Sequence, residues 1–203
     1  KVLLTVEGIS EEKILVISPY YHNMSDIVRN SNKKDILFWG AMYRPENYKA
    51  AIWFIKNVMP LLSSEDVRFV VAGNKPPEEL KKLENDKVIV TGFVEDEREL
   101  FEKSMCFVSP LLTGAGIKVK IIEAFSAGIP ILTNSIGIEG IPATNKYNYI
   151  HCETAKQYAD AIKKIQNGEI KEQRLLKNQK EFMKNHFDLD TALNEYVEMI
   201  KTL

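Results

Sequence analysis

The sequence has little of several things that define whole classes of protein. Two cysteines, Cys106 and Cys152, occur among 203 residues, and both lie in apolar stretches. We therefore expect reduced core thiols in a cytoplasmic protein rather than a disulfide or a metal site. No apolar run approaches the ~20 residues that a membrane span needs. The chain also opens without the apolar core or the cleavage site of a signal peptide.

An excess of one charge sign is also missing. The 27 Lys and Arg residues nearly cancel the 28 Asp and Glu residues, which leaves a formal net charge of -1. A general nucleic-acid binder needs a basic face for phosphates, so nucleic acid is not an expected partner. The chain lacks an initiator Met as well, and we expect it to be a piece of a longer protein.

What the sequence does have is an alternation of two hydrophobic periods. Runs rich in β-branched and aromatic residues predict strands at residues 36–39, 67–72, 87–90, 105–109, 129–133 and 148–152. Apolar residues at spacings of three and four predict helices between them, most clearly over residues 46–62 and 155–165. Strands that alternate with helices form parallel sheets covered on both faces. The expected fold class is therefore α/β, a Rossmann-like doubly wound parallel sheet.

The two ends of the chain differ from this alternating middle. Residues 1–33 hold one strand-like run, residues 14–17, and then a polar stretch, which predicts a remnant of a preceding domain and a linker. Residues 34–167 form the predicted Rossmann-like domain. Residues 168–203 are charged and helical, with a break near residues 187–190. We expect this helical extension either to pack back on the sheet by a narrow apolar stripe or to reach towards a missing domain.

The residues that carry chemistry follow the fourth predicted strand, over residues 113–128. Ligands of parallel sheets bind where the carboxyl end of a strand leads into a helix N-terminus, whose free N–H groups attract anions. Gly114 and Gly116 would let a ligand approach the backbone closely. Lys118 and Lys120 fall in the predicted first helical turn, where cations oppose the helix dipole unless an anion lies nearby. Two solvated surface lysines remain an equally good interpretation of that pair.

Glu123 adds a carboxylate to an otherwise apolar stretch of the same helix, where it needs a partner. At ~1.5 Å rise per residue, it lies roughly 10 Å along the helix from Gly116. This is about the distance from a diphosphate to the sugar hydroxyls of a nucleotide, and a carboxylate selects ribose in dinucleotide folds. We expect Glu123 to bind ribose, with an ion pair to Lys120 as the structural alternative.

Five segments, in order and at the expected spacing, resemble the C-terminal, donor-binding domain of family 4 GT-B glycosyltransferases (glycosyl transferases group 1). They begin at Phe38, Val70, Val90, Pro110 and Asn134, and read FWGAMYRPEN, VVAGN, VTGFV, PLLTGAGIKVKIIEAFSAGIP and NSIGIEG. The similarity covers roughly residue 14 to the C-terminus. It implies the C-terminal half of a GT-B enzyme that uses a nucleotide-diphosphate sugar as donor.

The resemblance implies a retaining hexosyltransferase that needs neither a metal nor a cofactor. Fixed N–H groups, a helix N-terminus and lysines can stabilise the leaving diphosphate. A nucleotide-sugar 2-epimerase of the same architecture and a non-catalytic nucleotide-sugar-binding domain remain alternatives. The acceptor, a glycan or a lipid-linked sugar, would bind a missing N-terminal domain, so this chain alone should bind donor but barely turn over. A lipid-linked acceptor would place the full-length protein peripherally at the inner face of the membrane.

The same resemblance assigns roles to single residues. Glu123 matches the second Glu of the family's Glu–seven-residues–Glu motif and holds the ribose, while Lys118 and Lys120 neutralise the departing diphosphate. The other expected substrate contacts are Gly40, Arg44, Gly92, Phe93, Val94, Thr113, Gly114, Ala115, Gly116 and Ile117. Arg44 aligns less cleanly, with a surface role as its alternative. The motif's first Glu falls at Ala115, so the carboxylate that often reads the sugar is absent.

Overall fold

The computed structural model describes residues 2–17, 19–30, 32 and 34–201, without the side chains of residues 2 and 3. Within them lies a six-stranded parallel sheet with the order β3-β2-β1-β4-β5-β6. Its strands are β1 (Asp35–Trp39), β2 (Arg68–Ala72), β3 (Val88–Gly92), β4 (Cys106–Ser109), β5 (Ile131–Thr133) and β6 (Ile150–His151). Each strand overlaps a predicted one, so the α/β prediction is confirmed.

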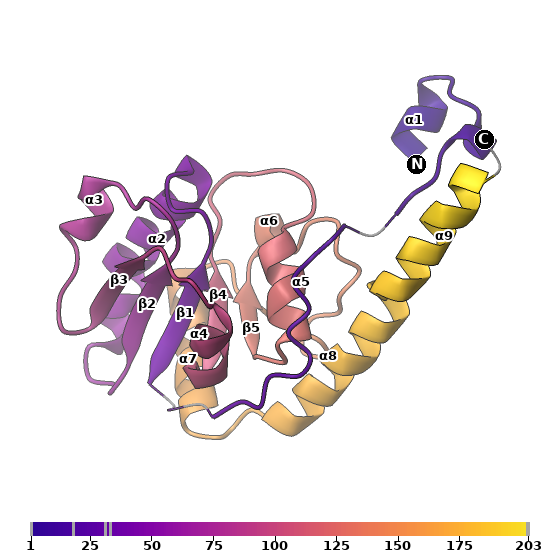
Figure 1. Cartoon of the computed structure of the whole chain (residues 1–203). Helices are drawn as coiled ribbons and strands as arrows, with labels where there is room; N and C mark the ends of the chain where they lie inside the picture. Colours follow the sequence, from indigo (N-terminus) through magenta and orange to yellow (C-terminus); the bar gives the residue numbers. More distant parts are fainter. Residues whose placement is uncertain (1, 18, 31, 33, 202–203) are drawn as a thin grey trace.

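Helices cover both faces of the sheet (Figure 1). One face carries α2 (Pro45–Asn57), η2 (Met59–Leu62), α3 (Glu78–Lys81) and α7 (Ala155–Gln166). The other face carries α4 (Arg98–Lys103), α5 (Val119–Ser126) and α8 (Glu172–His186). The short α6 (Ser135–Ile138) follows β5. This is the doubly wound arrangement that the sequence predicts.

Strand β1 shows how the sequence builds the two layers. Successive side chains of a strand point to opposite faces. Ile36 and Phe38 enter the core beneath α2 and α7, whereas Leu37 enters the core beneath α5 and α8. All three are fully buried, and this is why the strand is apolar throughout instead of alternating with polar residues.

The strand predicted at residues 14–17 is wrong. These residues form no strand, and the Val16 side chain is 62% exposed. With α1 (Val2–Val6) and η1 (Glu11–Lys13), they lie away from the sheet, on the side where α9 (Leu189–Lys201) ends (Figure 1). A β-rich run without a neighbouring strand has no ladder to join, so propensity alone does not make it a strand.

The C-terminal extension packs on the sheet only in part. In α8, Phe182 and Met183 are buried in the same core as α5. The helix ends at His186, and α9 begins after the predicted break. Ala192 is the buried residue of α9, while its exposed apolar side chains recur at helical spacing at Leu193, Tyr196, Val197 and Ile200. Within the described residues, no helix is both long enough and apolar enough to span a membrane.

Candidate functional site

The strand order creates one place where the loops diverge. The chain passes from β1 to β2 on one side of β1, whereas β4 lies on the other side. This order is the one found in dinucleotide-binding sheets, which bind ligands at the carboxyl ends of the strands at this switch point. The loop that contains Gly40 follows β1, and residues 110–118 follow β4. The predicted site residues of these two loops therefore follow neighbouring strands at the switch point.

The backbone packs closely where β1, β2 and β3 end. Gly40 N donates to Ala72 O at 3.1 Å, and Gly73 N donates to Gly92 O at 2.9 Å. A Cβ atom at Gly73 would lie 1.7 Å from Gly40 O, so only glycine fits there. The loops after β1, β2 and β3 are thus held edge to edge, with the predicted Gly40 and Gly92 on either side of Gly73.

The loop after β4 is open and exposed. Thr113, Gly114, Ala115, Gly116 and Ile117 are all exposed. Gly114 and Gly116 have φ angles of 136° and 72°, a backbone conformation that favours glycine. The backbone of this loop is therefore accessible, and its predicted role in binding a diphosphate stays a prediction.

Lys120 reaches from α5 to the end of β1. Its Nζ donates to Oδ1 of Asn47 at 2.5 Å and lies 4.7 Å from the centre of the Phe38 ring, a cation–π distance. Asn47, on the first turn of α2, has no role in the sequence prediction. Its only signal is its place at the end of the FWGAMYRPEN segment.

The ammonium of Lys120 is poorly hydrated, although the residue keeps some exposure. The pKa of Lys120 is lowered from 10.5 to about 7, chiefly by loss of hydration; the charge of Glu46 opposes this shift, and the charges of Lys118 and Arg44 add to it. A buried charge that meets a neutral group instead of an opposite charge is costly. An anion bound beside Lys120 would relieve this cost.

Lys118 has different surroundings. It precedes α5 as its N-cap residue, instead of lying in the first turn as predicted. Its Nζ donates to Gly116 O at 2.6 Å and to Oε2 of Glu139 at 3.1 Å, and only 9% of its side chain is exposed. The charge of Lys118 is therefore already shared with a carboxylate, which the sequence prediction did not anticipate.

Glu123 lies about one helical turn after Lys120 in α5. Burial raises the pKa of its carboxyl group, while hydrogen bonds from the His22 backbone and the Trp39 side chain lower it. The donor from His22 is its backbone N, at 3.4 Å from Oε1. Among the described residues, Lys120 bonds to Asn47 and not to Glu123, so the predicted alternative of a Lys120–Glu123 ion pair is not found.

The N-terminal linker brings His22 to this carboxylate. Tyr21 and Met24 anchor the linker in the core, and Met24 N donates to Oγ of Ser126 in α5 at 3.1 Å. His22 Nδ1 lies 2.9 Å from Oε1 of Glu97, a hydrogen bond that raises the pKa of His22. This arrangement has no signal in the sequence, because a single histidine in a polar linker is usually a surface residue.

Other predicted contacts lie at the margins of the site. Phe93 is 74% exposed, and Val94 is partly buried against the core. Arg44 is the N-cap residue of α2, with a side chain 59% exposed that forms an ion pair with Glu46 at 3.6 Å. Asn47 thus lies between Gly40 and Lys120, whereas Arg44 stays at the surface.

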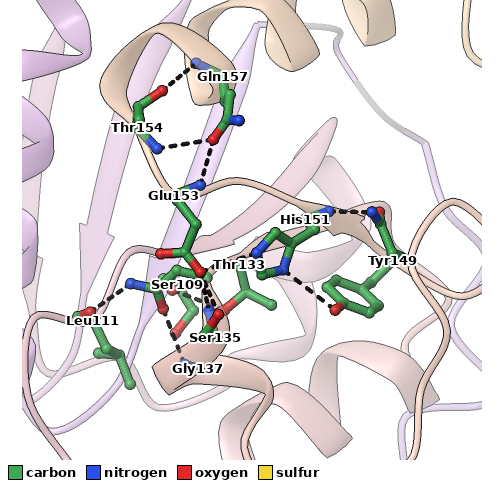
Figure 2. Close-up of polar contacts among 12 residues, drawn as sticks. Ser109, Leu111, Thr133, Ser135, Gly137, Tyr149, His151, Glu153, Thr154 and Gln157 are labelled. Atoms are coloured by element: carbon green, nitrogen blue, oxygen red, sulfur yellow. Dashed lines mark hydrogen bonds and ion pairs between the residues drawn. The ribbon is translucent and has the colours of Figure 1, made fainter.

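Polar contacts at the ends of β4 and β5 support the neighbouring loop (Figure 2). Thr133 Oγ1 donates to Ser109 O at 2.9 Å. Asn134 caps α6 by accepting from Gly137 N at 3.0 Å, and its amide group donates to Leu111 O at 2.6 Å. A Cβ atom at Gly137 would lie 1.9 Å from Thr133 Oγ1, which explains the glycine in the NSIGIEG segment.

Glu153 completes this support from the end of β6 (Figure 2). Its Oε1 accepts from Ser135 N at 2.8 Å and from the Ser135 hydroxyl, and lies 2.9 Å from His151 Nε2. These contacts lower the pKa of Glu153. The start of α6 is therefore fixed, and with it the loop that carries Glu139 to Lys118.

The fold is that of the C-terminal half of a GT-B protein, a Rossmann-like domain with a helical extension. The sequence profile of the family described as "Glycosyl transferases group 1" matches residues 33–167. The chain belongs to this family.

A curated relative is also similar to this chain. An uncharacterized 44.6 kDa protein in the cps region of Klebsiella pneumoniae is 30% identical over 138 residues, which cover 63% of this chain and 34% of that protein. The chain thus spans about a third of the length of this curated relative.

Two solved structures share the fold. A mutant of TarM from S. aureus, in complex with Fondaparinux, alpha-GlcNAc-glycerol and UDP, is 17% identical with a TM-score of 0.75, over 97% of this chain and 41% of that chain. The C-terminal domain of the glycosyl transferase group 1 family protein LpcC from Francisella tularensis is 18% identical with a TM-score of 0.61, over 86% of this chain and 97% of that domain. At these identities the likeness establishes the fold.

Proposed function

We propose that this chain is the donor-binding half of a glycosyltransferase, which transfers a sugar from a nucleoside-diphosphate sugar to an acceptor. The observation that carries the proposal is the uncompensated ammonium of Lys120 at the switch point, beside the open loop after β4. A diphosphate supplies the negative charge that this ammonium lacks. The family to which the chain belongs supports sugar transfer as the reaction.

In the proposed complex, the diphosphate lies between Lys120 and the loop of residues 113–117. The N–H groups at the start of α5 and the exposed loop donate hydrogen bonds to it, and Lys118 adds charge from the other side. As the sugar leaves, negative charge grows on the diphosphate, and these fixed groups stabilise it without reorganisation. We infer that transfer needs no metal because the chain supplies this charge itself.

Glu123 is proposed to accept hydrogen bonds from the ribose hydroxyls. His22 N and the Trp39 side chain hold its carboxylate in place and oppose the effect of burial on its pKa. The backbone of Gly92, Phe93 and Val94 would line the base pocket. UDP is the first nucleotide to test, since it is bound in the TarM complex.

The acceptor, a glycan or a lipid-linked sugar, is proposed to bind the part of the protein that this chain does not include. We propose retention of the anomeric configuration on the basis of the resemblance to family 4. The chain alone is proposed to bind donor and to be almost inactive. We place the protein in the cytoplasm, where buried thiols such as those of Cys106 and Cys152 stay reduced, or at the inner face of the membrane.

A calorimetric and thermal-shift panel of UDP, GDP and ADP, alone and with sugars attached, tests this function on the 203-residue chain. One nucleoside diphosphate should raise the melting temperature, because a ligand at 100 times its Kd stabilises by about 2.7 kcal/mol. Glu123→Ala and Lys120→Ala should each weaken binding, whereas Glu95→Ala, at an exposed position, should not. If the wild-type chain binds none of these compounds, the proposed function is wrong.

A further inference from the structure

Asn47 links two elements of the site through its side-chain amide. It is 6% exposed, on the first turn of α2. Its Nδ2 donates to Ala41 O at 2.9 Å, and its Oδ1 accepts from Lys120 Nζ at 2.5 Å. A carbonyl can only accept and an ammonium can only donate, so these partners fix the amide in one orientation. The loop after β1 therefore determines where the Lys120 ammonium lies.

We propose that Asn47 is a positioning residue of the donor site, which holds the Lys120 ammonium so that its remaining N–H groups bind the leaving diphosphate. This inference rests on the proposed function and adds a residue to it. An ammonium has three N–H donors. Among the described residues, Asn47 Oδ1 is the acceptor for one of them, and the ring of Phe38 lies beside the charge. The other donors are available to phosphate oxygens.

The chemistry of the amide explains why this position suits asparagine. A carboxylate in its place would pair with the ammonium and repel a diphosphate. An apolar side chain would leave the ammonium without an acceptor in a poorly hydrated place, which favours the neutral amine. A neutral amide orients Lys120 without cancelling its charge.

The arrangement also makes binding depend on pH in a defined direction. Among the described residues, the charges that act on Lys120 are those of Glu46 and Arg44 at the start of α2 and of Lys118 just before α5. With a pKa of about 7, most of the free lysine is neutral at pH 8. The terminal phosphate, with a pKa near 6, is ionised at about pH 8. Binding should therefore take up nearly one proton at pH 8, and affinity should fall as the pH rises above 7.

The test is calorimetry of the 203-residue chain with the tightest binder among UDP, GDP and ADP, at about pH 7 to 9 in two buffers of different ionisation enthalpy. Asn47→Leu should weaken binding at least about tenfold at pH 7. Asn47→Asp should keep Lys120 charged in the free protein, so proton uptake at pH 8 should disappear. The matched control is Asn57→Leu, at an exposed position of α2, which should bind and take up protons as wild type does.

The outcomes separate two failures. Absence of nucleotide binding by the wild-type chain overturns the proposed function. Wild-type binding with unchanged affinity in Asn47→Leu and unchanged proton uptake in Asn47→Asp overturns only the role of Asn47. Should Asn47→Leu unfold, Asn47→Ser takes its place, because its short hydroxyl side chain also removes the acceptor beside Lys120 Nζ; unchanged affinity in a folded Asn47→Ser would overturn the role of Asn47.

Discussion

Lys118 and Lys120 stand two residues apart at the start of α5, yet they lie in opposite electrostatic environments. Lys118 donates to Glu139, which follows α6, and to Gly116 O in its own loop. Lys120 turns to the loop after β1, where it meets the neutral amide of Asn47. One charge is balanced by the protein and the other is not.

This difference indicates that the two lysines contribute unequally to diphosphate affinity. Leaving a poorly hydrated charge unpaired destabilises the folded chain, and this cost is recovered only when an anion binds. Lys118 should contribute less to ligand affinity, because the ligand must compete with the Glu139 carboxylate that already pairs with it. Lys120, beside the loop after β1, should therefore contribute most of the diphosphate affinity. Lys118, paired with Glu139, should mainly hold its own loop in place.

The largest expected effect comes from removing the unbalanced charge. Lys120→Met should lower the affinity for the nucleoside diphosphate about 10- to 100-fold, because hydrogen bonds to charged groups contribute about 1.5–3 kcal/mol. The same substitution should raise the melting temperature of the ligand-free chain, since it removes a poorly hydrated ammonium. Calorimetry measures the first effect and thermal unfolding the second.

Lys118→Met is the paired measurement, and Lys49→Met, at an exposed position of α2, is the control. Lys118→Met should weaken binding by less than Lys120→Met and should not raise the melting temperature, because it leaves Glu139 without its partner. Equal losses of affinity in Lys118→Met and Lys120→Met would contradict the unequal contributions of the two lysines.

The next effect is the part of the pH dependence of stability that Lys120 contributes and that Lys120→Met should remove. Its pKa of about 7 in the folded chain lies below its ordinary value of 10.5, so the unfolded chain binds more protons between these two values. Stability should therefore rise with pH above 7, by up to about 1.4 kcal/mol per pH unit from this residue. Denaturant unfolding of wild type and Lys120→Met across this range measures it, and the difference between them should grow smaller as the pH rises. Parallel curves for the two proteins would show that Lys120 keeps an ordinary pKa.

Much of this site could be predicted from the sequence because its signals are local. The glycines at residues 114 and 116, the helix that follows them and the spacing of Glu123 all depend on neighbours within a few positions. The same holds for the strands, whose apolar runs reflect burial on both faces. Local signals failed where a run had no partner, as at residues 14–17.

The partners of the charged residues could not be predicted. Lys120 bonds to a residue 73 positions away, and Glu123 to one 101 positions away. Such pairs depend on the packing of α2 and of the N-terminal linker against α5, which no periodicity in either segment specifies. The candidate site residues therefore stay predictions from the sequence, and the different partners of Lys118 and Lys120 had no local signal.

Glu123→Gln should have a smaller effect, confined to the ribose. Hydrogen bonds to a carboxylate are about twice as strong as neutral ones, so we expect a loss of about five- to tenfold in affinity. The control is a 2′,3′-dideoxynucleoside diphosphate, which wild type and variant should bind equally well. An equal loss for both ligands would mean that Glu123 acts through the linker, since His22 N also bonds to it.

The smallest effect should come from the balanced side. Glu139→Gln removes the carboxylate that shares Lys118, and its side chain is 50% exposed. An exposed ion pair contributes ~0–1 kcal/mol, so stability should fall only slightly, and the released lysine should raise the nucleotide affinity about two- to threefold. Glu95→Gln, at an exposed position, serves as the control. In a Lys118→Met background the gain should vanish, because two residues in contact are not additive. If Glu139→Gln still raised the nucleotide affinity in the Lys118→Met background, Glu139 would repel the diphosphate directly. The comparison of Lys118 with Lys120 would then have to include the charge of Glu139.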